Sequence, residues 1–177
     1  KAICEGAGVT TGALYKRYKG KEDLFCAVVD QTVKDLYEVA HSRGDRDPAA
    51  MSDAELIKAW DMDGPDMMWW MRFLYDRHDD FVLLLSRSDG TRYANFQHDW
   101  VAVLTNATSA FLAEAQRRGI CRTDVGPEEL HILLSAFWTT IYEPFIHGFD
   151  WEQIEQHCRI VCKLFDWHKA LEFHVEK

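Results

Sequence analysis

Long apolar runs, prolines and paired cysteine motifs are scarce in this chain of 177 residues. The longest uncharged stretch, residues 100–113, has 14 residues and contains Thr, Asn and Ser. It is too short to cross a bilayer, and no charged-then-apolar signal peptide opens the chain. The five cysteines are odd in number and include no Cys-x-x-Cys pair. We therefore expect a cytoplasmic protein with reduced thiols and no contact with a membrane.

Charge is spread unevenly along the chain. Residues 1–21 contain five basic residues and one acid, a balance of +4, whereas the whole chain carries −9, which leaves −13 for the rest. A basic segment on an acidic protein favours an anionic partner for that segment alone, although a chance fluctuation of surface charge gives the same pattern. Because Lys1 stands where an initiator Met would be, we also expect the natural N-terminus to be missing.

Apolar residues recur at three- and four-residue steps along the chain, and no alternating strand pattern is evident, so the fold is expected to be all-α. Ser52 with Glu55 predicts a capping box, and Gly119 is expected to close a long helix. Pro144 should bend or end its helix because it lacks an N–H. The expected helices run from Glu22 to about Gly44, start at Ser52 and at Gly64-Pro65, and cover 78–87, 90–118, 127–147 and 150–174.

The opening stretch ICEGAGVTTGALYKRYKGKEDLF, residues 3–25, predicts two short helices joined by a turn. Gly8 permits that turn, Val9 is expected to fill it, and Thr10 is a good N-cap for the second helix. Leu14 and Tyr18 lie four residues apart and are expected to face inward. The opposite side carries residues that can approach a DNA groove and its phosphates. They are Thr11, Gly12, Tyr15, Lys16 and Arg17.

The stretch AGVTTGALYKRYKGKEDLF resembles the signature of the TetR family of bacterial transcriptional regulators, A-G-V-S-x-G-x-L-Y-x-x-F-x-x-K-E-x-L-F. The resemblance implies a helix-turn-helix DNA-binding domain at 1–28, with its first helix missing, and a helical ligand-binding and dimerisation domain at 29–177. The matching residues are Ala7, Gly8, Val9, Thr10, Gly12, Leu14, Tyr15, Tyr18, Lys21, Glu22, Leu24 and Phe25.

By this resemblance, Thr10, Thr11, Gly12, Tyr15, Lys16 and Arg17 line the recognition helix, and Lys21 holds a backbone phosphate. The implied partner is double-stranded DNA with a near-palindromic operator, and the family's common mode is repression that a small molecule relieves. The chain departs from the pattern at Gly20, which offers no capping side chain, and at Tyr18, which replaces Phe. In the competing interpretation, a helical hairpin in an all-α enzyme, the basic residues are incidental.

An aromatic cluster predicts a pocket for an apolar or aromatic effector, although ordinary core packing explains any one of its residues. The expected ligand-binding residues are Trp69, Trp70, Phe73, Tyr93, Phe96, Trp100, Phe137 and Tyr142, with Trp138 beside them. The carboxylates of Asp61, Asp63 and Asp66 either recognise a cation together with the ring faces or form a solvated helix end.

Two helices, 127–147 and 150–174, each have a wide apolar face and are expected to form a four-helix interface in a homodimer. Some of each face must pack inside its own subunit. Cys158, Cys162 and His157 have spacing compatible with a metal, but buried thiols are commonly plain hydrophobes, so no metal and no cofactor are expected. No nucleophile elbow, P-loop or metalloprotease motif is present, so we expect no catalytic residues. The functional alternative is a helical small-molecule-binding protein that no longer binds DNA.

Overall fold

The computed structural model describes residues 2–44, 46–61, 64–121 and 124–174. Within these ranges the chain is helical and contains no strand, as expected. Its elements are α1 (Ala2–Gly6), α2 (Thr11–Arg17), α3 (Lys21–Gly44), the short 3-10 helix η1 (Pro48–Ala50), α4 (Asp53–Lys58), α5 (Gly64–Tyr75), α6 (His78–Arg87), α7 (Phe96–Arg118), α8 (Pro127–Ile146), α9 (Trp151–Leu164) and α10 (Trp167–Ala170).

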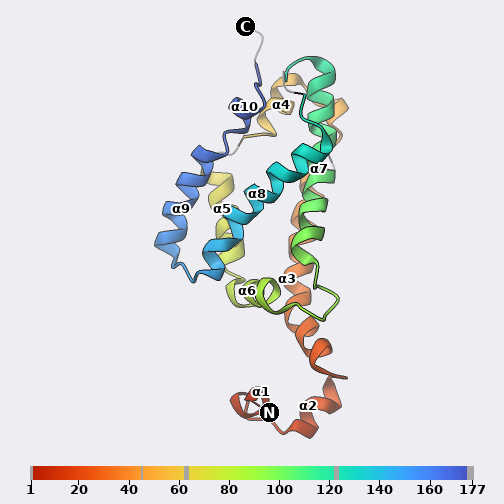
Figure 1. Cartoon of the computed structure of the whole chain (residues 1–177), viewed down its shortest axis with the longest axis vertical. Helices are drawn as coiled ribbons and strands as arrows, with labels where there is room; N and C mark the ends of the chain where they lie inside the picture. Colours follow the sequence, from red (N-terminus) through yellow and green to blue (C-terminus); the bar gives the residue numbers. More distant parts are fainter. Residues whose placement is uncertain (1, 45, 62–63, 122–123, 175–177) are drawn as a thin grey trace.

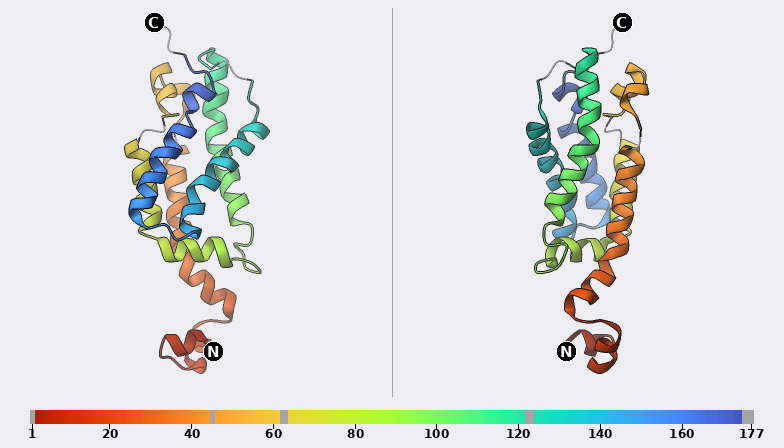
Figure 2. Two further views of the ribbon diagram at one scale, coloured as in Figure 1. Left: turned by 60° about the vertical axis from the view of Figure 1, so that its left-hand side comes forward. Right: turned by 90° about the vertical axis from the view of Figure 1, so that its right-hand side faces the viewer.

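The helices α1 and α2 form a small head at one end of the molecule, and α3 leads from it into a body made of the remaining helices (Figure 1). From Val29 onward, α3 buries one residue per turn against the body, including Val33, Leu36 and Ala40. The two further views show α3 and α7 running lengthwise through the body, with α6 crossing at its lower end (Figure 2). One continuous apolar core joins α3 to α10.

Local capping signals set several helix boundaries. The reciprocal capping box of Ser52 and Glu55 opens α4, and a second one formed by Asp150 and Gln153 opens α9. Gly119 ends α7 at φ 71°, in the left-handed region that glycine adopts without strain. The predicted starts of α4 and α9 and the predicted end of α7 are thereby confirmed.

The predicted helix 90–118 begins six residues later, at Phe96. Residues before it form turns that side chains stabilise: Thr91 Oγ1 donates to the Ser88 carbonyl at 2.7 Å and accepts from the Tyr93 N–H at 3.1 Å. Gly90 takes φ 74° in the same segment. Such bonds from a side chain to a nearby backbone group compete with helix formation.

The predicted helix 150–174 was wrong as a single element. It ends at Leu164, and Asp166 caps the short α10 by accepting the N–H of Lys169 at 3.0 Å. The break brings the rings of Phe165 and Trp167 against Phe137 of α8, with centroids 5.1 and 6.2 Å away. Aromatic packing between helices thus accompanies the interruption.

Pro144 does not end α8, which continues to Ile146. A proline inside a helix leaves the carbonyl four residues earlier without its usual donor, here that of Thr140. His157 of α9 supplies a donor, because its Nε2 lies 2.8 Å from the Thr140 oxygen. A neighbouring helix therefore compensates for the proline.

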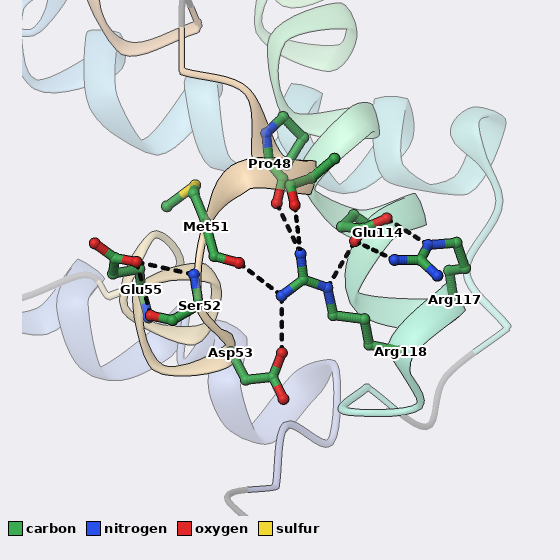
Figure 3. Close-up of polar contacts among 9 residues, drawn as sticks. Pro48, Met51, Ser52, Asp53, Glu55, Glu114, Arg117 and Arg118 are labelled. Atoms are coloured by element: carbon green, nitrogen blue, oxygen red, sulfur yellow. Dashed lines mark hydrogen bonds and ion pairs between the residues drawn. The ribbon is translucent and has the colours of Figure 1, made fainter.

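Arg118 joins the end of α7 to η1 and the start of α4 (Figure 3). Its Nε donates to Glu114 at 2.6 Å, and Nη1 donates to the Met51 carbonyl at 2.7 Å and to Asp53 at 2.8 Å. Its Nη2 donates to the carbonyls of Pro48 and Ala49 at 3.2 and 3.1 Å. These bonds use all five donors of the guanidinium.

Glu114 is expected to make the stability of the body fall in acid. Hydrogen bonds from Arg117 and Arg118 lower the pKa of this carboxyl from 4.5 to about 2. Because the unfolded chain regains the higher pKa, the contribution is complete above pH 4.5 and is lost as the pH falls towards 2. The Tm of the unchanged protein should therefore exceed that of Glu114→Gln at pH 7 and approach it at pH 3. A difference that stays constant with pH would contradict this.

Candidate DNA-binding head and ligand cavity

The head has the geometry of a helix-turn-helix. The turn after α1 passes through Gly8 at φ 63°, and the Val9 N–H bonds to the Cys4 carbonyl at 3.0 Å. Thr10 then caps α2, since its Oγ1 accepts the N–H of Ala13 at 3.1 Å. Both features follow the sequence-based expectation. Val9 is exposed rather than filling the turn, and Cys4 is the buried residue of α1.

The residues expected to contact DNA lie on the outside of the head. All seven are exposed. They are Thr10, Thr11, Gly12, Tyr15, Lys16, Arg17 and Lys21. Leu14 and Tyr18 are half-buried, in keeping with an inward-facing side of α2, and the Arg17 guanidinium lies 5.6 Å from the centre of the Tyr18 ring. The small residues at the start of α2 leave its backbone accessible.

Lys21 is the first residue of α3, next to backbone N–H groups that suit an anion. Asp23 reaches back from that turn to accept the Lys19 N–H at 2.9 Å. This carboxylate provides a side-chain acceptor at the helix start, where Gly20 offers none. Its role was not predicted from the sequence, although an acidic residue three positions after the cap was a usable signal.

The turn between α6 and α7 ties the lower part of α3 to the body. The Arg92 N–H donates to Glu22 at 3.0 Å, and the Arg92 guanidinium forms an ion pair with Asp30. Tyr93 also donates its hydroxyl to Asp30, at 2.7 Å. Burial alone would raise the pKa of Asp30, but these hydrogen bonds outweigh it and keep the pKa below its usual value. The carboxylate is therefore held in its charged form.

A cavity of about 130 Å³ lies in the body between α3, α5, α7 and α8. Three of the expected ligand-binding residues, Trp70, Trp100 and Phe137, line it. The others lie outside its lining among the described residues: Trp69, Phe73, Tyr93, Phe96 and Tyr142. The remaining lining residues are Val39, Ala40, Asp61, Asp66, Met67, Leu104 and Trp138.

The residues outside the lining have other surroundings. Trp69 is half exposed on α5, and Tyr93 belongs to the contact with Asp30. Phe73 and Phe96 continue a series of nearly parallel rings in the order Phe73, Trp70, Trp100, Phe96, with interplanar angles of 9°, 8° and 18°. Tyr142 packs beside Trp138 instead. Some rings of this aromatic cluster thus line the cavity, whereas others only pack against them.

Of the three acidic residues near the cluster, Asp61 and Asp66 line the cavity and Asp63 lies outside the described residues. The Asp61 carboxylate is 3.2 Å from Nε2 of His168, a nitrogen that also lies 2.9 Å from the Ile57 carbonyl oxygen. Carboxylates therefore lie on this side of the cavity, with the imidazole of His168 beside Asp61.

Cys158 and His157 on α9 take part in packing and hydrogen bonding within the body. Cys158 is buried, and burial raises the pKa of its thiol to about 12. His157 donates to Thr140 as described above. Among the described residues no three His, Cys, Asp or Glu side chains are grouped as metal ligands, and the five cysteines form no disulfide. No described helix has the length and apolarity that a bilayer span requires.

Comparison with known proteins identifies the head. Residues 1–28 match the family model described as bacterial regulatory proteins, tetR family. No curated protein matched the chain, and no solved structure did. The match covers the two helices of the head, the intervening turn and the start of α3, and this is the segment that carries the exposed basic residues. Residues 1–28 are thus similar to the amino-terminal segment of the tetR family of bacterial regulatory proteins, which supports a DNA-binding regulator.

Proposed function

We propose that the chain is a cytoplasmic homodimeric repressor that binds a near-palindromic operator through α2 and Lys21 and is released when a small molecule fills the aromatic cavity. The observation that carries this proposal is the exposure of every expected DNA-contact residue on a head set at the end of the molecule (Figure 1). The basic balance of residues 1–21 and the acidic balance of the rest favour docking of the head on phosphate.

Exposed apolar side chains on α8 and α9 support the proposed dimer. Ile132 on α8 is 66 % exposed, and Ile160 and Leu164 on α9 are 56 % and 68 % exposed. The two helices lie side by side on one side of the body (Figure 2). Pairing them with their counterparts would bury these side chains and place two heads for half-sites about 34–36 Å apart.

The small molecule can control the regulator only by binding the DNA-bound and free conformations with different affinities. The cavity is suited to this role because its walls come from helices that also hold α3. Val39 and Ala40 of α3 line it together with Trp100 of α7, and the turn that leads into α7 contacts Asp30 of α3. A change in this packing would therefore alter the position of the head.

A titration of the complete translation product against its own upstream DNA at several salt concentrations tests the proposal. Specific binding should weaken steeply as salt rises, because each phosphate contact releases condensed counterions. Weak binding to every DNA alike would contradict it and would favour a helical small-molecule-binding protein without a DNA function. The same assay then measures release by candidate effectors.

Replacing Lys21 with alanine should weaken binding to all sequences alike, since a phosphate contact carries no base information. We expect the slope of log affinity against log salt to become shallower by about 0.9 for each phosphate that the variant no longer neutralises. Lys34→Ala is the matched control. Lys34 is also exposed on α3, but it lies on the part of the helix that packs against the body, away from the head, and it pairs with Glu38 at 3.6 Å. An equal effect of both variants would refute the assigned role of Lys21.

A further inference from the structure

Two carboxylates, those of Glu22 and Asp23, directly follow Lys21 at the start of α3. Negative charge suits the first turn of a helix, but it repels a DNA phosphate that docks at the same place. The charge of these side chains therefore opposes the binding proposed for Lys21. Their hydrogen bonds point to other roles.

The two carboxylates bind different parts of the molecule. Glu22 accepts the N–H of Arg92 at 3.0 Å and thereby ties α3 to the body. Asp23 accepts the N–H of Lys19 at 2.9 Å, and Lys19 belongs to the connection between α2 and α3. The bond of Asp23 thus lies within the head, next to the residues proposed to contact DNA.

The connection between α2 and α3 has three residues, Tyr18 to Gly20, and lies where the head joins the long helix (Figure 1). At its first residue, the Tyr18 N–H donates to the Leu14 carbonyl of α2 at 2.9 Å. At its last residue, the Gly20 carbonyl accepts the Leu24 N–H of α3 at 3.2 Å. The bond from Lys19 to the Asp23 carboxylate fixes the residue between them.

Gly20 gives this connection unusual freedom. Glycine has a wider choice of backbone conformations than any other residue, and a Cβ atom at Gly20 would meet no other atom within 4 Å. Neither a side chain nor close packing therefore restrains the chain at this position. The angle between α2 and α3 depends on the hydrogen bonds of the connection, including that of Asp23.

We infer that Asp23 is a positioning residue for DNA binding: by holding Lys19, it fixes the turn between α2 and α3, so that Lys21 meets a phosphate while α2 lies in the major groove. The inference rests on the proposed function, in which α2 and Lys21 bind the operator. Two contact points held in a fixed relation bind more tightly than two that must first be ordered. This gain outweighs the repulsion between the carboxylate and the phosphate.

The variants Asp23→Ala and Asp23→Asn separate the acceptor from the charge. Alanine removes both, whereas the amide oxygen of asparagine still accepts a hydrogen bond and carries no charge. In the salt-dependent titration of the complete protein, Asp23→Ala should bind the operator about 3- to 10-fold more weakly, the usual effect of losing a side-chain cap. Asp23→Asn should stay within about 2-fold of the unchanged protein or bind more tightly. Equal weakening by both variants, or tighter binding by Asp23→Ala, would overturn the inference.

A double variant tests whether Asp23 acts through Lys21. Once Lys21→Ala has removed the phosphate contact, there is less for Asp23 to position, so adding Asp23→Ala should cost about 2-fold or less. The slope of log affinity against log salt should also be shallower in Asp23→Ala than in the unchanged protein. An undiminished loss in the double variant would show that Asp23 does not act through Lys21.

Asp47→Ala is the matched control for a general loss of stability. Asp47 also accepts a backbone N–H, that of Ala49 at 2.9 Å, but it caps η1 in the body, away from the head. This variant loses a similar hydrogen bond and should keep its operator affinity within about 2-fold. A loss as large as that of Asp23→Ala would show that the effect is not specific to the head.

Failure of this inference and failure of the proposed function give different results. Weak binding of the unchanged protein to every DNA alike contradicts the proposed function, and the inference with it. Specific, salt-dependent binding by the unchanged protein, together with full affinity in Asp23→Ala, contradicts the inference alone.

Discussion

Placing glutamate at both Ile160 and Leu164 is expected to convert the proposed dimer into monomers and to lower operator affinity by about 100-fold or more. Both side chains are large, apolar and mostly exposed on α9, so their burial between two subunits would favour association. Charged replacements would have to lose water on association without gaining a partner. Two linked DNA-binding heads exceed one by about 10²- to 10⁴-fold in avidity, and the monomer loses this advantage.

The mass of each variant, measured by light scattering after size exclusion, tests the first half of this prediction. Val28→Glu serves as the control for mass, because Val28 is also an exposed apolar residue but lies on α3 near the head. The control should remain a dimer. If the double variant also remains a dimer, the subunits associate through a different surface, and the assignment of α8 and α9 is wrong.

Replacing Arg118 with alanine is expected to lower the Tm by roughly 5–10 °C, the largest loss of stability among the changes considered. The change removes five hydrogen bonds and leaves the carbonyls of Pro48, Ala49 and Met51 without this donor (Figure 3). It also removes a partner from Glu114, whose side chain is only 10 % exposed. The segment from η1 to α4 would then lose its main polar connection to α7.

Arg117→Ala is a close control for this experiment. Arg117 also pairs with Glu114, at 2.6 Å, but its side chain is 69 % exposed, compared with 17 % for Arg118. Because the Arg117 side chain is mostly solvated and Arg118 remains as a partner for Glu114, this replacement should change the Tm by about 2 °C or less. Arg118→Lys should resemble the alanine variant more than the unchanged protein, because an ammonium cannot reproduce the planar set of five donors. Equal losses for Arg117→Ala and Arg118→Ala would show that the bonds to η1 and α4 matter little.

The helix boundaries that were predictable are those with local signals. Ser52 and Glu55 lie three residues apart in the chain, and both bonds of their capping box form within that short segment. Gly119 likewise ends α7 through its own backbone conformation. Such signals act before any tertiary contact is made, so a pattern in the sequence is enough to identify them.

Two features near the carboxyl end of the chain depend on residues from other helices. Pro144 is tolerated inside α8 because His157, from the next helix, supplies a donor to Thr140. The break after Leu164 lets Phe165 and Trp167 pack on Phe137, a residue of the preceding helix. Apolar periodicity continued through this break, so it predicted one helix where the chain forms two.

The head could be predicted almost completely, and the cavity only in part. The head depends on Gly8, Thr10 and a run of exposed residues, all close in sequence. Aromatic rings from separate helices can either enclose a cavity or fill a core, and their tertiary packing decides which of the two forms. The predicted ligand-binding set therefore includes Trp70, Trp100 and Phe137, which line the cavity, but also Tyr93, which donates a hydrogen bond to Asp30 instead.

The contacts of Arg92 connect the start of α3, next to the head, rigidly to the α6–α7 turn. Since this residue holds α3 at both Glu22 and Asp30, the helical segment between them should move with the α6–α7 turn as one stiff arm. The arm from Asp30 to Lys21 is about 14 Å long at 1.5 Å per residue, so a tilt of about 15° displaces its tip by roughly 4 Å. In a two-fold dimer the tips move in opposite directions, which changes their span by roughly 7 Å against a half-site spacing of about 34–36 Å. In the proposed dimer, a small angular change at the α6–α7 turn would therefore displace each head by several ångströms, enough to change how the two heads match a pair of half-sites.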